Sequence, residues 1–237
     1  KRVVSLDELA KEEFKLAGIK LNPANFSRSR VSAKYSALEL KHVQSGTVVN
    51  VNNLPQGIIR SPRWSANSEY LAFILEQPEN ARLWIYNVKS KQAKQLSEYP
   101  LNSTLTSTPY EWLPDSTAIV ANLAVNLDKP RLTNDTQSTV PVIQQSSGEK
   151  APARTYQNLL TSPFDEAQFK FYGQGQLAYI TLDGKAQPIG RAGLFKSFSI
   201  SPDSTNILVA TIDEPFSYQV PYSRFATTWE IWGMRGF

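Results

Sequence analysis

The chain has 237 residues, of which 41% are apolar and 11% aromatic, and it carries one histidine, His42, and no cysteine. This length and apolar content allow a sizeable core in one large or two small domains. The composition excludes disulfide frameworks, thiolate zinc sites, iron–sulfur clusters and cysteine nucleophiles, and only His42 could serve a Ser–His–acid triad. No apolar run approaches the roughly 18 residues of a membrane span. We expect no metal, no cofactor and no membrane span.

The formal net charge of +4 is concentrated near the start of the chain. Residues 1–60 hold ten Lys and Arg against five Asp and Glu, whereas residues 61–237 hold fifteen against sixteen. No run of five basic residues occurs, so we expect a solvated basic surface rather than a nucleic-acid site.

Residues 5–17 form the one segment with a helical signal at the start of the chain. Ser5 and Glu8 are spaced as a capping box, apolar residues follow at helical spacing, and Gly18 is a plausible stop. We therefore predict a short N-terminal helix here, and a basic loop that completes residues 1–34.

Beyond residue 34 the pattern changes to short runs rich in β-branched and aromatic residues, separated by turn residues. The predicted strands are Ala37–His42, Thr47–Val51, Tyr70–Leu75, Leu83–Val88, Ala118–Ala124, Leu177–Leu182, Ile207–Ile212 and Trp229–Trp232. The chain is therefore predicted to be all-β after its helical start.

Two landmarks repeat along this β region. The segments 64–73, 112–121 and 200–209 align as an aromatic or apolar residue, a turn such as Pro-Asp-Ser, and a β-branched run; they are 48 and then 88 positions apart, and 88 is twice 44. A second landmark, a strand before a tight turn, begins at Leu38, Leu83 and Leu177. The first spacing is 45 positions and the second is 94, which is twice 47. Both spacings give a period in the mid-forties.

A unit of about 45 residues with four short antiparallel strands is the blade of a β-propeller. We predict a partial propeller of about four blades over residues 35–237, with Trp64, Trp84 and Trp112 packed between blades. A β-sandwich with chance similarity between segments is the alternative. Residues 125–170 interrupt the repeat as a long insertion, in which residues 158–170 could add a helical turn or two. The last strand, Trp229–Trp232, begins a unit that is not completed, which suggests a longer protein.

Four segments carry a family resemblance: Leu21–Arg30, Tyr110–Ser116, Gly148–Leu160 and Val220–Phe225. In that order they resemble the propeller of glutamyl-endopeptidase-like members of the prolyl oligopeptidase family of serine peptidases, and Gly148–Leu160 is the most specific of them. Ser68, Ser116 and Ser204 stand at turn positions where relatives commonly have glycine.

The resemblance implies a propeller followed by a C-terminal α/β-hydrolase domain with a Ser–Asp–His triad on a G-x-S-x-G elbow. This chain has no G-x-S-x-G, and His42 falls in a repeat strand, so no catalytic residue is carried over. The implied role is a non-catalytic propeller that gates and positions peptide substrates for the hydrolase domain, in a periplasmic or secreted protein. Any peptidase activity would belong to the full-length protein. The alternative is a non-enzymatic periplasmic propeller that serves as a scaffold for protein–protein interaction.

A family preference for glutamate would require a cationic group for the substrate carboxylate, and arginine suits this because its planar fork accepts a carboxylate bidentately. The candidate substrate-binding residues lie in the family-like segments; they are Arg28, Arg30, Arg154, Tyr156, Tyr222 and Arg224. The same arginines could instead clamp loops through backbone carbonyls. Asp165-Glu166 is expected to start a helix or lie on the surface rather than to act as an acid–base pair or metal ligands.

Overall fold

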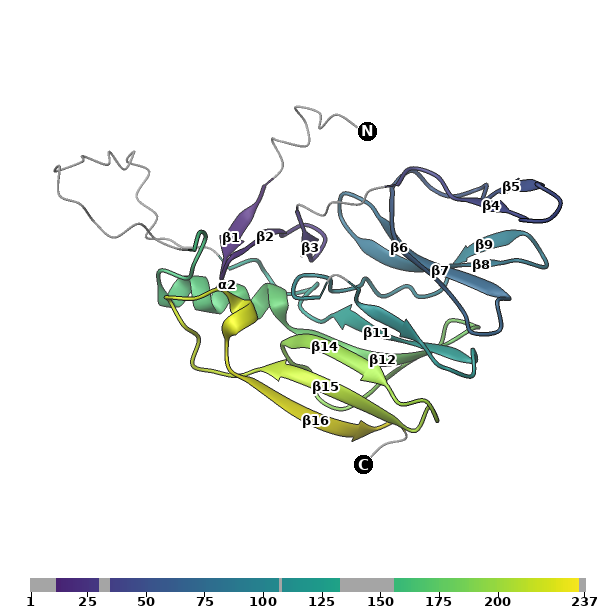
Figure 1. The fold of residues 1–237 in the computed structure, drawn as a ribbon. Helices are drawn as coiled ribbons and strands as arrows, with labels where there is room; N and C mark the ends of the chain where they lie inside the picture. The colour runs from purple at the N-terminus through teal and green to yellow at the C-terminus, as the bar shows by residue number, and fades with distance from the viewer. Residues whose placement is uncertain (1–11, 30–34, 107, 133–155, 235–237) are drawn as a thin grey trace.

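The computed structural model describes residues 12–29, 35–106, 108–132 and 156–234, and there the backbone is mostly antiparallel β-sheet. Four sheets are stacked side by side like the blades of a fan, and a small fifth sheet lies beside the helix α2 (Figure 1). The sheets do not lie as two face-to-face layers, and the described residues do not close a ring (Figure 1). The predicted partial β-propeller is therefore confirmed, and the sandwich is not.

The blades are numbered here in chain order. Blade I is β4 (Glu39–Lys41) and β5 (Val48–Asn50); blade II is β6 (Ile58–Trp64), β7 (Tyr70–Glu76), β8 (Ala81–Asn87) and β9 (Gln92–Gln95); blade III is β10 (Tyr110–Trp112), β11 (Ala118–Ala124), β12 (Gly175–Thr181) and β13 (Ala186–Pro188); blade IV is β14 (Phe195–Ile200), β15 (Asn206–Ile212) and β16 (Thr227–Gly233). Neighbouring strands in each blade are consecutive in sequence and antiparallel. Each predicted strand matches one of these.

The first two strands of blades II, III and IV are joined by one repeated turn. Ser68, Ser116 and Ser204 occupy the same left-handed backbone conformation, with φ of 60°, 62° and 60°. The residue before each serine, which is Asn67, Asp115 or Asp203, accepts through its side chain the amide of the residue after the serine. Glycine adopts this conformation without steric cost, whereas a residue with a Cβ adopts it at a cost.

Apolar side chains fill the spaces between adjacent blades. Ile74, Leu83 and Ile85 of blade II meet Ile119 and Ile180 of blade III in one cluster in which each is almost fully buried. Burying a side chain of this size contributes roughly 1.5–3 kcal/mol. Corresponding clusters join blades I and II and blades III and IV, so the stacking of blades forms the core.

Polar contacts also cross from blade II to blade III. The buried Tyr110 hydroxyl lies against two carbonyls of blade II, those of Ser61 and, at 2.9 Å, Ala72, and it can donate its proton to either. The Trp112 indole donates to the Arg63 carbonyl at 3.1 Å. Trp112 thus packs between blades as predicted, and Trp84 packs against the cluster of blades I and II. Trp64 differs: it is 50% exposed, because in the described residues blade I supplies only two strands to cover that side.

The doubled spacing between the second and third landmarks has a different cause from the one predicted. β11 pairs directly with β12 in a seven-residue register, although Ala124 and Gly175 are 51 positions apart. The long insertion therefore lies between two strands of blade III, and the spacing of 88 is a single blade period lengthened by that insertion. Residues 133–155 of the insertion lie outside the described residues.

The N-terminal helix prediction is wrong over its last residues. β1 (Phe14–Leu16) pairs with β2 (Ile19–Asn22), and β3 (Ser27–Arg28) completes this sheet. Gly18 is not a helix stop but part of the tight β1–β2 turn, at φ +84°. A Cβ at Gly18 would lie 2.5 Å from the Pro221 Cβ, so only glycine fits. Residues 5–11 lie outside the described residues.

Candidate functional site

The short helix α2 (Pro163–Gly173) organises the region where the candidate arginines lie. Ser162 caps its N-terminus by accepting the Asp165 amide at 3.2 Å, and Pro163 occupies the first turn, where a missing N–H costs nothing. Asp165 itself accepts the Thr161 amide and hydroxyl at 2.7 and 2.6 Å. The predicted helix-start role of Asp165 is confirmed.

Three of the four family-like segments converge on α2. The buried rings of Phe169 and Tyr172 on the helix pack against Leu21 and Phe26 from the first segment and Phe225 from the last. The third segment contributes Leu160, which is also buried in this cluster. In Figure 1 the β1–β3 sheet, α2 and the 3₁₀ helix η1 (Tyr222–Arg224) accordingly lie side by side, although they come from opposite ends of the chain. We call this region the α2 cluster.

The Arg28 guanidinium forms its hydrogen bonds inside the α2 cluster. Its Nε donates to the Thr104 carbonyl at 3.0 Å and its Nη2 to the Leu105 carbonyl at 2.7 Å. Nη2 also donates to the Tyr222 hydroxyl, whose own proton goes to the Leu105 carbonyl at 3.0 Å. Arg28 and Tyr222 therefore clamp the chain near residue 105, which is the loop-clamping alternative that the sequence left open.

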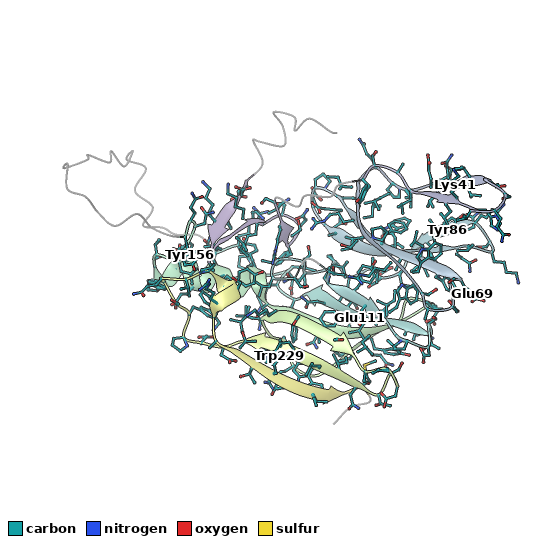
Figure 2. All side chains as sticks on the ribbon, in the orientation of Figure 1. Lys41, Glu69, Tyr86, Glu111, Tyr156 and Trp229 are labelled. Carbon is teal, nitrogen blue, oxygen red and sulfur yellow. The ribbon has the colours of Figure 1, made fainter. Side chains whose placement is uncertain are left out.

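Arg224 is arranged differently. Its guanidinium carbon lies 5.4 Å from the centre of the Tyr156 ring, which is within the range of a cation–π contact. The residue is exposed, and no carboxylate among the described residues forms an ion pair with it. The structure thus brings two predicted residues together, and within the described ranges the Arg224 guanidinium has no carboxylate partner. Tyr156 lies at the α2 end of the molecule, away from Lys41 and Tyr86 (Figure 2).

Arg191 provides a comparison for Arg224, because it also lies over an aromatic ring but forms an ion pair. It lies 5.7 Å from the Trp232 ring, but its Nη2 also donates to both carboxylate oxygens of Glu230, at 3.1 and 2.9 Å. The positive charge of Arg191 is therefore already paired with a carboxylate. The contrast singles out Arg224 among the three Arg–aromatic pairs of the described residues. Arg30 and Arg154 lie outside those residues.

His42 does not form part of a catalytic triad in the described structure. It follows β4 in the exposed hairpin of blade I, where its Nδ1 lies 2.9 Å from the Ser45 hydroxyl and accepts the Ser45 amide at 3.1 Å. These contacts close a turn of four residues, and no carboxylate is found bonded to the ring within residues 35–106. In the described ranges no group of three His, Cys, Asp or Glu side chains could hold a metal. No helix there has the length and apolar content to cross a membrane.

Burial raises the pKa of groups between the blades, and it also raises the pKa of the Tyr172 phenol on α2. Burial raises the pKa of the Glu111 carboxyl above its ordinary value, while the Ile200 backbone and the Arg63 charge oppose that rise. Burial likewise raises the pKa of the Tyr110 phenol. Sequence reasoning missed both residues, because neither belongs to a recognisable catalytic spacing.

The described residues thus define a β-propeller region with an arginine-bearing cluster at one end. The chain is 30% identical over 245 aligned residues to a probable chloroplastic glutamyl endopeptidase of Oryza sativa subsp. japonica, an alignment that covers 98% of this chain and 26% of the relative. A probable chloroplastic glutamyl endopeptidase of Arabidopsis thaliana is 28% identical, over 98% of this chain and 25% of its own length. The predicted resemblance to glutamyl endopeptidases is confirmed, and the chain spans about a quarter of their length.

No family model matches the chain. Among solved structures, an acylaminoacyl peptidase of Pyrococcus horikoshii is similar with a TM-score of 0.49 at 17% identity, over 85% of this chain and 27% of that one. The tricorn protease has the same TM-score at 13% identity, over 94% of this chain and 15% of that one.

Proposed function

We propose that this chain is the non-catalytic propeller region of a serine peptidase of the prolyl oligopeptidase family, and that it gates and positions peptide substrates for a C-terminal α/β-hydrolase domain. The observation that carries the proposal is the similarity of 98% of the chain to glutamyl endopeptidases that are about four times as long. A region of this size with a β-propeller fold and without a catalytic constellation in its described residues fits an accessory role.

In this proposal the chemistry belongs to the hydrolase domain, where a serine nucleophile and a histidine base carry out acyl transfer. The propeller limits access to short or unfolded peptides. A glutamate side chain brought to the α2 cluster would meet the guanidinium of Arg224, which can donate two parallel N–H bonds to one carboxylate. The Tyr156 ring, whose centre is 5.4 Å from the guanidinium carbon, would hold the arginine near that position through a cation–π contact.

The first test is to read the gene beyond Phe237 and to assay the chain by itself. A G-x-S-x-G elbow with a downstream Asp and His supports the peptidase, and a stop codon within one blade supports the interaction scaffold instead. The isolated chain should not hydrolyse a Glu-containing reporter peptide. Hydrolysis that a serine-directed inhibitor abolishes would contradict the non-catalytic role.

The second test measures kcat/KM of the full-length protein on paired peptides that differ only in Glu or Gln at the cleaved position. Arg224→Met should lower kcat/KM about tenfold or more for the Glu peptide and little for the Gln peptide, because only the former loses a charge-assisted bond. Arg191→Met is the matched control, since it removes another arginine stacked on an aromatic ring whose charge is already paired. Equal losses on both peptides would refute a role of Arg224 in carboxylate binding.

We also propose a periplasmic or secreted location, which fractionation of the native host tests directly.

A further inference from the structure

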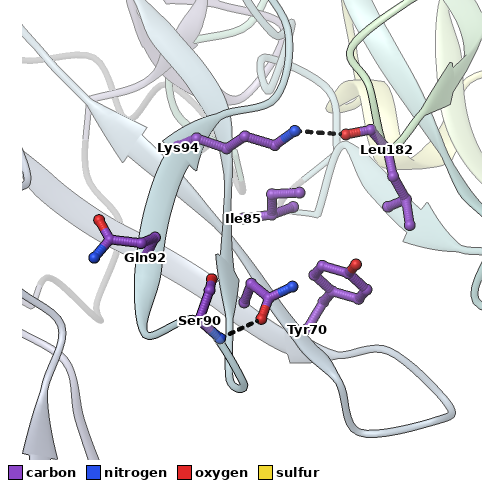
Figure 3. Close-up of a pocket in the computed structure, with 7 residues that line it drawn as sticks. Tyr70, Ile85, Ser90, Gln92, Lys94 and Leu182 are labelled. Carbon is purple, nitrogen blue, oxygen red and sulfur yellow. Dashed lines mark hydrogen bonds between the residues drawn. The ribbon is translucent and has the colours of Figure 1, made fainter.

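A small cavity opens between blades II and III, away from the α2 cluster. Its volume is about 270 Å³, and it is lined by Tyr70, Ile85, Asn87, Ser90, Gln92, Lys94 and Leu182 (Figure 3). Tyr70 begins β7, Ile85 and Asn87 lie in β8, Ser90 lies in the β8–β9 turn, Gln92 and Lys94 lie in β9, and Leu182 directly follows β12. The volume lies just below the usual range of ligand pockets and suits a chain of a few carbon atoms.

The lining combines an apolar surface with hydrogen-bond donors and contains no Asp or Glu. Lys94 Nζ donates to the Leu182 carbonyl at 2.8 Å, which places the ammonium at the cavity and leaves two of its three N–H groups for a ligand (Figure 3). The Asn87 Oδ1 accepts the Ser90 amide at 2.8 Å, so the amide side chain presents its NH₂ group as a remaining donor. The partly buried Leu182 and Tyr70 ring supply most of the apolar part, because Ile85 is almost fully buried.

The corresponding position between blades III and IV is built differently. Ile85 in β8 pairs with the third residue of β7, and Tyr179 in β12 pairs with the third residue of β11. The two residues therefore occupy equivalent positions in their blades. Tyr179 and Met234, which follows β16 as Leu182 follows β12, both pack against the buried cluster there. At the first junction Tyr70 and Leu182 also pack against the buried cluster, and the Tyr70 ring lies 6.2 Å from the Trp112 ring. The two junctions therefore share their apolar packing and differ in the side chains at these positions.

The charges around the cavity favour an anion. Lys94 is the one charged residue of the lining, and Glu69, which precedes Tyr70, lies outside the lining and accepts the Asn67 side-chain amide at 3.2 Å. The nearest acidic residue in sequence to Leu182 is Asp183, whose carboxylate is already engaged by the Thr181 hydroxyl and by Lys185 Nζ at 3.1 Å.

We propose that this cavity, named here the inter-blade pocket, binds a carboxylate carried on a short aliphatic chain. Lys94 and the Asn87 amide receive the carboxylate, Tyr70 can add a hydroxyl donor, and Leu182 contacts the aliphatic part. The carboxylate can come from a free small acid or from an acidic side chain of a peptide, and the chemistry is the same. The pocket is separate from the α2 cluster and stands independently of the peptidase proposal.

The test is a titration of the ¹⁵N-labelled 237-residue chain, followed by NMR, with three probes: glutarate, the capped peptide acetyl-Ala-Glu-Ala-amide, and its Gln analogue. We expect at least one carboxylate probe to shift the Asn87 side-chain amide and the Ser90 backbone amide in a saturable way. The Gln analogue should bind at least fivefold more weakly. Glutarate binding identifies a free acid as sufficient, whereas binding of the Glu peptide alone identifies a side chain presented by a peptide.

Two variants and one control locate the site. Lys94→Met should weaken binding about tenfold, and Tyr70→Phe, which keeps the ring beside Trp112, should weaken it severalfold. Lys89→Met removes the same charge from the exposed hairpin and should change the affinity less than twofold. Absence of saturable shifts with both carboxylate probes, equal binding of the Gln peptide, or equal effects of Lys94→Met and Lys89→Met would each overturn the proposal.

Discussion

Replacing the three equivalent turn serines by glycine provides a sensitive test of how the blades are joined. Ser68, Ser116 and Ser204 share a left-handed conformation that costs a non-glycine residue about 1–2 kcal/mol. Glycine relieves that cost but loses about 0.5–1 kcal/mol through the greater freedom of the unfolded chain. The backbone contribution is therefore the same at all three positions, a stabilisation of about 0.5–1 kcal/mol.

The three hydroxyls, however, have different surroundings. Ser116 accepts the Asn67 amide of blade II at 3.0 Å, a bond between blades worth about 1 kcal/mol. The Ser204 hydroxyl is buried without a hydrogen-bond partner in the described structure, so its removal relieves a cost of about 1 kcal/mol or more. Ser68 is exposed and serves as the reference.

We therefore expect Ser204→Gly to stabilise the fold by about 1.5–2 kcal/mol, Ser68→Gly by about 0.5–1 kcal/mol, and Ser116→Gly to leave it nearly unchanged. Urea denaturation of each variant measures the free energy of unfolding, and a difference of 1 kcal/mol moves the thermal midpoint by roughly 2–4 °C in a chain of this size. Identical shifts for all three variants would show that the hydroxyl contacts carry no energy. A loss of stability in all three would show that the left-handed conformation is not strained.

Three further predictions concern contacts that join distant segments. Tyr110→Phe removes the buried hydroxyl that can donate to the Ser61 or Ala72 carbonyl across blades, and it should lower the free energy of unfolding by about 1–2 kcal/mol in urea denaturation; an unchanged midpoint would contradict the inter-blade role of this hydroxyl. Arg28→Lys should speed amide hydrogen exchange around Leu105 and the α2 cluster, because lysine cannot reproduce the guanidinium's two directed bonds to adjacent carbonyls. Exchange in blade I should be unchanged and serves as the internal reference. Burial raises the pKa of Glu111 above 4.5, so the folded state retains its proton longer than the unfolded state, and the free energy of unfolding must fall as pH rises from about 4.5 through the folded-state pKa. Glu111→Gln should remove this fall, gaining stability relative to the natural chain at pH 7 but not at pH 4, and parallel pH profiles for the two proteins would refute the assignment.

Most of the fold could be predicted because each blade is encoded locally. The run Ala118–Ala124 matches β11 at both ends, and it forms a strand because its β-branched and small residues pack on both faces between blades. The serine turns repeat because one backbone conformation must reverse the chain in every blade. Such signals depend on neighbours within about ten residues, and the sequence displays them directly.

The helix prediction over residues 5–17 shows where local signals mislead. Phe14 and Leu16 have helical spacing with earlier apolar residues, yet they lie in a strand that pairs across the Gly18 turn and packs beside α2. The partner surface comes from residues more than 140 positions later, and tertiary contacts override a weak propensity. The candidate arginines could be predicted from the family-like segments in which they lie. Their separate roles could not be predicted, because the local sequence does not distinguish Arg28 from Arg224.

The sequence by itself determined the blades, their turns and the resemblance to glutamyl endopeptidases, because periodic apolar patterns and turn residues act over short distances. Only the tertiary structure decided that the long insertion lies within blade III, that Arg28 donates to carbonyls 76 and 77 positions away, and that Arg224 lies over the Tyr156 ring with no ion-pair partner among the described residues. The same holds for the inter-blade pocket, whose lining joins Lys94 to a carbonyl 88 positions further along. These features depend on which segments meet in space, and that is settled by the packing of whole blades rather than by any single segment.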